Sequence, residues 1–368
     1  MREVDMKDQR RENETKGWAG GVPGRGFSQG TRGRAFAMSI AIFAVGTGLV
    51  PANGEAARFC SATASAQHAA CLNEIQDDFF TARAICINIS DAVVRKGCFL
   101  EAEQELEEGG NLCRQQRRAR GQLCRALGED RYEPDFDPAN FDDDFTNLTN
   151  PNFYFPLAIG NIWEYAAADE TNRIEVLDKT KLIEGVTCIV ANDLVQKEGG
   201  SEDTDDWYAH RQDGTVVYCG ESVRDFETFV GDNPQEPELV AIEGSFKVGR
   251  DGDLSGTIFL AMPTVGTTYR QESSLGNAED AATVLSTTYG FGNDPELDEF
   301  VPQALVELLC ANDCVVTGDF TPIEPGVLQR KYYAHGIGLF LEVDAKSGGI
   351  NQLVNCNFDA RCAALPAP

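Results

Sequence analysis

Two stretches decide how the first part of this chain folds: CSATASAQHAACLNEIQDDFFTARAIC at residues 60–86 and CFLEAEQELEEGGNLCRQQRRARGQLC at residues 98–124. The steps between their six cysteines are 11, 15, 12, 15 and 11 residues, a series that is the same in both directions. In an antiparallel helix pair, residues whose numbers add up to a constant lie opposite each other, and the outer, middle and inner cysteine pairs all add up to 184. The spacing therefore predicts two antiparallel helices that fold back near Ala92 and are joined by three disulfides: Cys60–Cys124, Cys71–Cys113 and Cys86–Cys98.

Helical geometry supports this register. Steps of 11 and 15 residues return to within roughly 20° and 60° of the same helix face. Ser90 and Asp91 can turn the chain and cap the second helix. Gly109 falls opposite Ile75, which lets the backbones approach as closely as disulfides require. Two helices alone cannot bury a proper core, so we expect the disulfides to replace it. His68 lies on the same seam, where a structural role is favoured.

The six-cysteine segment is similar in architecture to twin-cysteine helical hairpins of the CHCH type, although in those hairpins the cysteines are closer together and the disulfides fewer. A zinc site is disfavoured because close Cys-x-x-Cys pairs are absent from these stretches.

The N-terminal residues 1–57 have the order of a secretory signal. Arginines at positions 25, 32 and 34 precede an apolar run at residues 35–50, and small residues follow up to Ala57. This order predicts a disordered extension and a signal peptide cleaved near Ala56 or Ala57. A membrane anchor is the alternative, but the run is short for a span. All 12 cysteines follow the signal, so we expect a periplasmic, extracellular or cell-surface protein.

Charge separates the two mature parts. Residues 58–127 hold nine basic and nine acidic side chains, whereas residues 128–368 hold 14 and 44, a net charge of −30. Such a surface repels nucleic acid and anionic membranes and can bind divalent cations weakly. We therefore expect a protein or small-molecule partner, no nucleic acid, no stable membrane span after cleavage and no cofactor.

The remaining chain divides into a linker and a β domain. Residues 128–150 combine prolines with a run of aspartates, which predicts an extended acidic linker whose phenylalanines 136, 141 and 145 can dock on a neighbour. Residues 151–368 contain many short alternating runs, with Asp213-Gly214 as a hairpin signal and a short helix expected at 295–309. The predicted fold is α+β, mainly β: a disulfide-joined helical hairpin at 58–127 followed by an antiparallel domain of half-barrel or barrel-like form.

The β domain carries a resemblance. Its opening from Asn150 to Leu157, with Gly160 and Trp163, and its later segment from Lys331 to Leu339 resemble a domain of exported bacterial proteins of unassigned function. The likeness covers most of residues 150–344, and the run Gly336-Ile-Gly338 is similar to that of periplasmic half-barrel domains. The resemblance implies an exported bacterial protein and supplies no catalytic residues.

Candidate site residues are few, because the chain has no nucleophile elbow, His-Glu-x-x-His, phosphate loop or dinucleotide motif. Strand alternation places Asp206, Tyr208 and His210 on one face, which would bind a ligand if it faces inward and would be an ordinary polar face if it faces water.

A calcium loop is a second candidate. Asp251, Asp253 and Ser255 match the start of such a loop, but Met262 stands where an EF-hand needs an acidic residue. A partial site and a plain turn both remain open.

Six cysteines lie in the β domain. Cys310 and Cys314, and Cys356 and Cys362, are near enough in sequence for local disulfides, which would leave Cys188 with Cys219, although other pairings remain open. Together these features predict a non-catalytic binding or interaction protein. The alternatives are a carrier of an apolar ligand inside the β domain and a hydrolase using Asp206 and His210.

Overall fold

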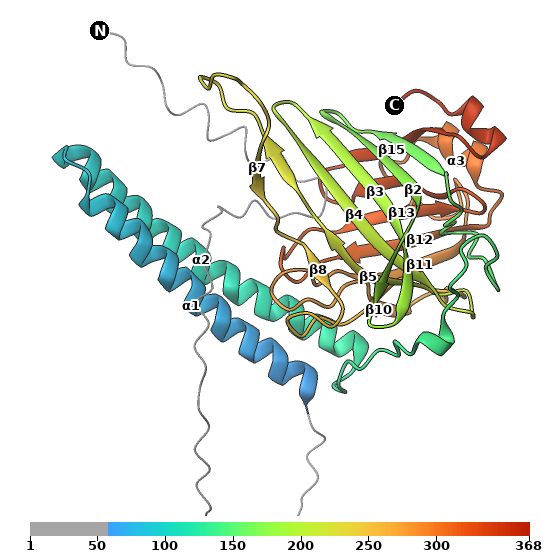
Figure 1. Cartoon of the computed structure of the whole chain (residues 1–368), viewed down its shortest axis with the longest axis horizontal. Coiled ribbons are helices and arrows are strands. Elements are labelled where there is room, and N and C mark those ends of the chain that lie inside the picture. Colours follow the sequence, from blue (N-terminus) through green and yellow to red (C-terminus); the bar gives the residue numbers. More distant parts are fainter. Residues whose placement is uncertain (1–57) are drawn as a thin grey trace, which may run out of the picture.

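The computed structural model describes residues 58–368 (Figure 1), so the predicted extension and signal peptide at 1–57 lie outside the described residues. Two antiparallel helices, α1 (Phe59–Ile87) and α2 (Ala92–Leu127), precede a large antiparallel sheet, as predicted. The hairpin has the three predicted disulfides, with Cα–Cα distances of 5.6 Å for Cys60–Cys124, 5.8 Å for Cys71–Cys113 and 5.6 Å for Cys86–Cys98.

The details of the hairpin follow from its sequence. A carboxylate oxygen of Asp91 accepts hydrogen bonds from the backbone N–H groups of Val93 and Val94 at 2.8 and 2.9 Å, which caps α2. A Cβ atom on Gly109 would lie 2.9 Å from Cγ2 of Ile75, so glycine permits the close approach. Only Ala64 and Cys86 of α1 are buried, so the disulfides do replace a core.

Among the described residues, fifteen strands form one sheet in which all neighbouring strands are antiparallel. The main path runs β10-β11-β12-β13-β14-β15-β1-β2-β3-β4-β5-β8, while β9 pairs with β5, and β6 and β7 extend from β4. The strands are β1 (Ile162–Ala166), β2 (Glu170–Ile183), β3 (Val186–Lys197), β4 (Gly200–His210), β5 (Val216–Ser222), β6 (Asp225–Glu227), β7 (Glu238–Ala241), β8 (Phe246–Lys247), β9 (Gly256–Phe259), β10 (Thr268–Arg270), β11 (Ala281–Tyr289), β12 (Cys314–Phe320), β13 (Gln329–Ala334), β14 (Gly338–Asp344) and β15 (Ile350–Cys356).

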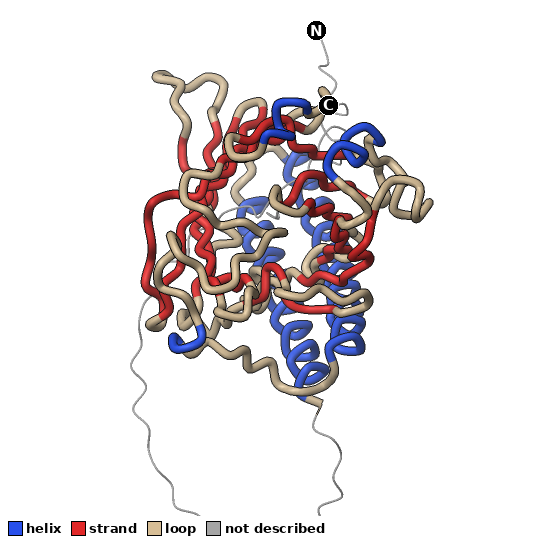
Figure 2. Tube along the Cα trace, turned by 90° about the vertical axis from the view of Figure 1, so that its right-hand side faces the viewer, coloured by secondary structure: helices blue, strands red, loops and turns tan. Residues whose placement is uncertain are grey.

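The sheet curves into a half-barrel that does not close. Figure 2 shows its strands on two sides, with the helices behind. The two ends of the sheet approach at one corner, where Leu254 forms a bridge with Ser273. A Cβ atom on Gly256 would lie 1.8 Å from the carbonyl oxygen of Gln271, so only glycine allows β9 to come so near the end of β10.

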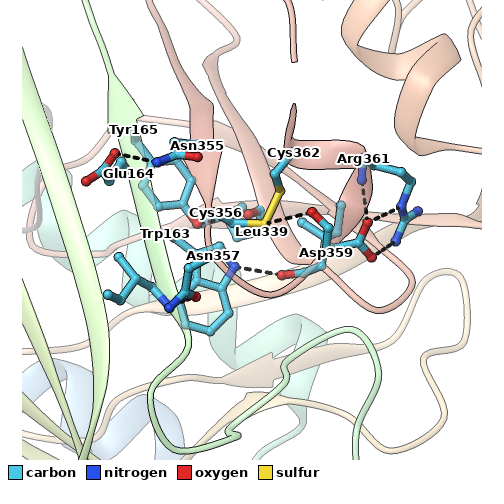
Figure 3. Close-up of a disulfide and its surroundings, with 12 residues drawn as sticks. Trp163, Glu164, Tyr165, Leu339, Asn355, Cys356, Asn357, Asp359, Arg361 and Cys362 are labelled. Atoms are coloured by element: carbon cyan, nitrogen blue, oxygen red, sulfur yellow. Dashed lines mark hydrogen bonds and ion pairs between the residues drawn. A yellow bond between two sulfur atoms is a disulfide. The ribbon is translucent and has the colours of Figure 1, made fainter. Parts of the chain in front are cut away.

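The middle of the sheet joins β1 to β15 (Figure 3). Trp163 donates from Nε1 to the carbonyl oxygen of Ile337 at 2.7 Å, and Tyr165 donates from Oη to that of Leu339 at 2.9 Å. The Cys356–Cys362 disulfide ties the end of β15 to the 3-10 helix η2 (Ala360–Ala364).

The acidic segment 128–150 packs on the sheet through its aromatic residues. Phe141 and Phe145 are buried, and Phe136 packs beside Phe141. Its regular structure is limited to the 3-10 helix η1 (Pro138–Asn140). The helix expected at 295–309 is shorter than predicted: α3 spans Gln303–Leu309. Asp294 accepts from the backbone N–H of Glu296 at 3.0 Å and so favours a turn at the expected start.

The hairpin docks on the β domain through polar residues near the end of α2. Gln116 donates from Nε2 to the carbonyl oxygen of Ile323 at 2.9 Å. Arg120 makes two contacts with the Glu279 carboxylate, at 2.7 and 2.8 Å, and both side chains are buried. These residues interrupt the apolar pattern of α2 because they form the interface.

All 12 cysteines lie in the described part of the chain, and all are paired. The β-domain pairs are Cys188–Cys219, Cys310–Cys314 and Cys356–Cys362, as the favoured pairing predicts. Six disulfides indicate an oxidising, non-cytoplasmic compartment. Within residues 58–368, no helix is both long and apolar enough to cross a membrane.

Candidate functional site

Polar side chains cover much of the inner face of the half-barrel. Residues opposite each other in a strand pair share a face. Asp193 of β3 is opposite Thr204 of β4, and Asp206 is opposite Glu221 of β5. On the other side of the half-barrel, Lys331 of β13 is opposite both Thr317 of β12 and Glu342 of β14. We call this set the acidic inner face: Asp193, Glu202, Asp206, Glu221, Glu272, Asp280, Asp319, Lys331 and Glu342, with the tyrosines 165, 208, 218, 269 and 333.

Side chains from the two sides of the half-barrel approach one another on this face. The ring of Phe259 on β9 packs against that of Tyr333 on β13, with centroids 4.7 Å apart. The pKa of Tyr165 is raised well above its usual range by burial and then by Glu342 and Asp193, which come from opposite sides. Carboxylates far apart in the sequence therefore share one environment.

Burial shifts these carboxyl groups toward their protonated forms. It raises the pKa of Asp193, Glu221 and Glu272 well above the usual range, and neighbouring carboxylates add to each shift. Burial also raises the pKa of Asp206 to about 6 and that of Asp280 to about 6. A set of acids that repel one another in a poorly hydrated place is costly to ionise together, so it favours either protons or a bound cation.

Lys331 is the one basic side chain within this set. Burial alone would lower its pKa, but the carboxylates of Glu342 and Asp319 more than offset this, so its pKa lies well above the usual range. Its Nζ lies 3.4 Å from Glu342 and 3.5 Å from Asp319. It offsets part of the negative charge on the β12–β14 side, whereas the β2–β5 side of this set has carboxylates and no lysine or arginine.

Acceptor oxygens without a protein partner lie on this second side and on β15. Seven buried side-chain atoms of residues 58–368 lack a hydrogen-bond partner, and four of them lie on β2, β3 and β15. These four are Glu170 Oε1, Asn172 Oδ1, Asp193 Oδ1 and Asn351 Oδ1. When the acids are ionised, all four atoms can only accept, so a hydrogen-bond donor would satisfy them.

The orientation of the two amides supports this conclusion. Asn172 directs its Nδ2 toward Asp193 and Asn351 directs its Nδ2 toward Glu342, each at 3.5 Å. Turning either amide around would place its oxygen against a carboxylate, so the free amide oxygens follow from the charges nearby. Asn351 is only 5% exposed. Burial, followed by the neighbouring Asp169 carboxylate, raises the pKa of Glu170 to about 7.

Two of the three residues predicted from the β4 pattern belong to this face. Tyr218 donates its hydroxyl hydrogen to Asp206 Oδ1, and the rings of Tyr208 and Tyr218 stack with centroids 5.1 Å apart. His210 lies on the same side of β4, opposite Val216, but its contact differs: it is fully buried, and its Nδ1 lies 2.8 Å from Asp142 Oδ2. The alternative in which Asp206 and His210 form an acid–imidazole pair is therefore absent from these contacts, and His210 instead fixes segment 128–150 to the end of β4.

The residues of the candidate calcium loop differ in exposure. Asp251 points into solvent with its carboxylate 84% exposed and 3.5 Å from Arg250, whereas Asp253 and Ser255 are buried. In the described part of the chain, no cluster of three His, Cys, Asp or Glu side chains could hold a metal ion. Weak binding of divalent cations at single carboxylates stays a prediction.

Sequence reasoning missed Asp193, Glu221, Glu272 and Lys331. A signal existed for two of them. Asp193 follows the largely buried run Val186–Ala191 of its strand, and Lys331 lies directly before two buried tyrosines on β13. A charged residue on such a strand faces either a partner or a ligand. The carboxylates converge only through the curvature of the sheet, which the sequence does not display.

Comparison with known proteins does not assign this chain to a family. No family model matches this chain, and no curated protein or solved structure is significantly similar to it.

Proposed function

We propose that this chain is an exported, non-catalytic binding protein of the periplasm or cell surface, and that its acidic inner face holds an organic cation, an amine or a guanidinium. The observation that carries the proposal is the group of four unpartnered acceptor oxygens on β2, β3 and β15. An ammonium or guanidinium group supplies several N–H donors together with a positive charge, so it satisfies both the oxygens and the carboxylates.

The tyrosines fit the same ligand class. Tyr165, Tyr208 and Tyr218 surround the carboxylates of β3–β5, and aromatic faces attract organic cations. The polar lining disfavours an apolar ligand on this part of the face. A hydrolase using Asp206 and His210 receives no support, because each of these residues has a different partner.

Binding of a cation is linked to protons. When Glu170 and Asp193 are protonated, their hydroxyl groups can donate to the free acceptors, so protons and the ligand compete for one place. The affinity for an amine should therefore rise from pH 5 to pH 8, and binding should release protons.

The test is a thermal-shift titration at pH 8 with spermidine and arginine amide as probes and calcium chloride as the inorganic comparison. We expect either organic cation to raise the melting temperature of the exported protein, and Asp193→Asn to abolish the rise. The matched control is Asp251→Asn, which makes the same chemical change on an exposed carboxylate and should respond like the wild type. No shift with either amine, an equal shift in Asp193→Asn, or a shift with calcium alone would reject the proposed ligand class.

A further inference from the structure

The free end of the helical hairpin exposes large apolar side chains. We call residues 80–100 the hairpin tip. Figure 1 shows it projecting beyond the sheet. Six of its apolar side chains are 52–81% exposed: Phe80, Ile85, Ile87, Val93, Val94 and Leu100. Leaving so much apolar surface in water is unfavourable, and contiguous exposed apolar side chains are typical of sites that bind a partner or a membrane.

The charge of the tip is opposite to that of the β domain. It holds Arg83, Arg95 and Lys96 against one acidic residue, Asp91, whose carboxylate caps α2. The guanidinium of Arg83 lies over the rings of Phe79 and Phe99, at 5.4 and 5.9 Å, so this charge is placed among the apolar side chains. Acidic residues return on both sides, at 77–78 and from 101 onward, which confines the apolar and basic character to the end of the hairpin.

The tip is also held away from the acidic domain. The contacts of α2 with the β domain involve Gln116 and Arg120, and α2 begins 24 residues before Gln116, at Ala92. At 1.5 Å per residue this is roughly 35 Å of helix. The screening length at physiological salt is about 8 Å, so the −30 charge of the β domain has little effect at the tip. The repulsion of anionic membranes expected from the total charge therefore does not apply at this end.

We propose that the hairpin tip inserts into the surface of an anionic lipid bilayer and holds the β domain above it. Interfacial binding needs buried apolar area together with basic residues, and the tip carries both. A narrow, convex end of two helices offers little area for a protein interface, but its side chains can enter the boundary of headgroups and acyl chains. The segment between β6 and β7 provides the contrast: it exposes Val230 even more, at 97%, but acidic residues surround it.

The test is co-sedimentation of the exported protein with vesicles of phosphatidylglycerol and phosphatidylcholine, and with vesicles of phosphatidylcholine alone. We expect binding to the anionic vesicles that weakens with added salt and with Lys96→Gln. The double variant Val93→Asp/Val94→Asp should lower the partition coefficient at least about tenfold, the equivalent of about 1.4 kcal/mol. Both positions are exposed and lie in the first turn of α2, where a carboxylate favours the helix, so the variant should keep its helical circular dichroism.

Val230→Asp is the control, since it makes the same valine-to-aspartate change at one exposed position of the β domain and should bind like the wild type. The proposal is overturned if the wild type stays in the supernatant with anionic vesicles, or if the double variant binds equally well. Sedimentation velocity without lipid tests whether a second copy of this chain binds the hairpin tip instead. A dimer that the double variant dissociates would assign the tip to self-association and would also overturn the membrane proposal.

Discussion

The helical hairpin and the β domain are stabilised in different ways. The hairpin buries few side chains and relies on three nested disulfides, the longest closing 64 residues. The β domain has a continuous core that includes Tyr289, Tyr332, Phe340 and Leu353, all nearly inaccessible to water. The disulfides stabilise the hairpin by restricting its unfolded state, whereas the β domain is stabilised by burying apolar side chains in its folded state. Removing either source of stability should therefore affect one region first.

Reduction should give the largest difference between the two regions. Each hairpin disulfide contributes about 2–4 kcal/mol in the chain-entropy account, so the loss of three exceeds what this sparse core can replace. With increasing dithiothreitol, the helical circular dichroism should fall first, while the fluorescence of the buried Trp163 and Trp207 should persist. Loss of both signals at one reductant concentration would show that the two regions unfold as a single unit.

Uncoupling the two regions should have the next largest effect. Arg120→Ala leaves the buried Glu279 carboxylate without its cation, and breaking such a pair typically costs about 3–5 kcal/mol. We expect a less stable protein whose hairpin and β domain melt separately in calorimetry. Arg117→Ala on the exposed side of α2 is the control and should leave the thermogram unchanged. An unchanged thermogram for Arg120→Ala would mean that other contacts hold the hairpin in place.

The pH dependence of stability should give the smallest effect and should be confined to the β domain. The raised pKa of Asp206, about 6, and of Glu170, about 7, mean that the folded state binds more protons than the unfolded state between about pH 4 and pH 7. The free energy of unfolding should therefore fall as the pH rises through this window. The contribution of Asp206, whose pKa rises from 3.8 to about 6, is on the order of 3 kcal/mol. Carboxyl groups with a lowered pKa, such as that of Asp142, act below this window.

The measurement is the melting temperature of the β domain from pH 5 to pH 8, in the absence of amines. We expect it to be higher at pH 5, and Asp206→Asn should flatten the profile while Asp251→Asn leaves it as it is. A melting temperature that rises with pH would contradict the protonated inner face. A flat profile for the hairpin signal would sharpen the difference between the two regions.

Most of the hairpin could be predicted from the sequence because its contacts obey a simple arithmetic. The cysteine spacing gave the register, Asp91 the cap and Gly109 the close approach, each from a local rule. The strands of the β domain were also predictable from alternation, as the turn at Asp213-Gly214 shows: Gly214 has a φ of +96°. What local patterns could not supply is which strands face each other across the curve.

The candidate site shows this limit most clearly. Asp206 and Tyr208 could be placed on one face by alternation. Their neighbour Asp193 lies on β3 and Glu272 lies just after the end of β10, and the positions of both depend on the whole sheet. His210 lies on the same strand, yet its partner Asp142 comes from the acidic segment, which the sequence indicated only as extended. Likewise, Gln116 and Arg120 interrupt the apolar pattern of α2 because they contact residues of the β domain about 160–210 positions further along the chain.

The pairing of β1 with β15 in the middle of the sheet means that the sheet cannot form completely until the end of the chain is present. Strand β1 is synthesised long before its partner β15, and the separation between Trp163 and Cys356 spans most of the domain. Until β15 arrives, the chain holds two separate meanders, β1–β5 and β10–β14, each with an unpaired central edge. Exposed edges bind other strands readily. A chain stopped before Ile350 should therefore be prone to aggregation. The final strand, β15, joins the two meanders into one sheet.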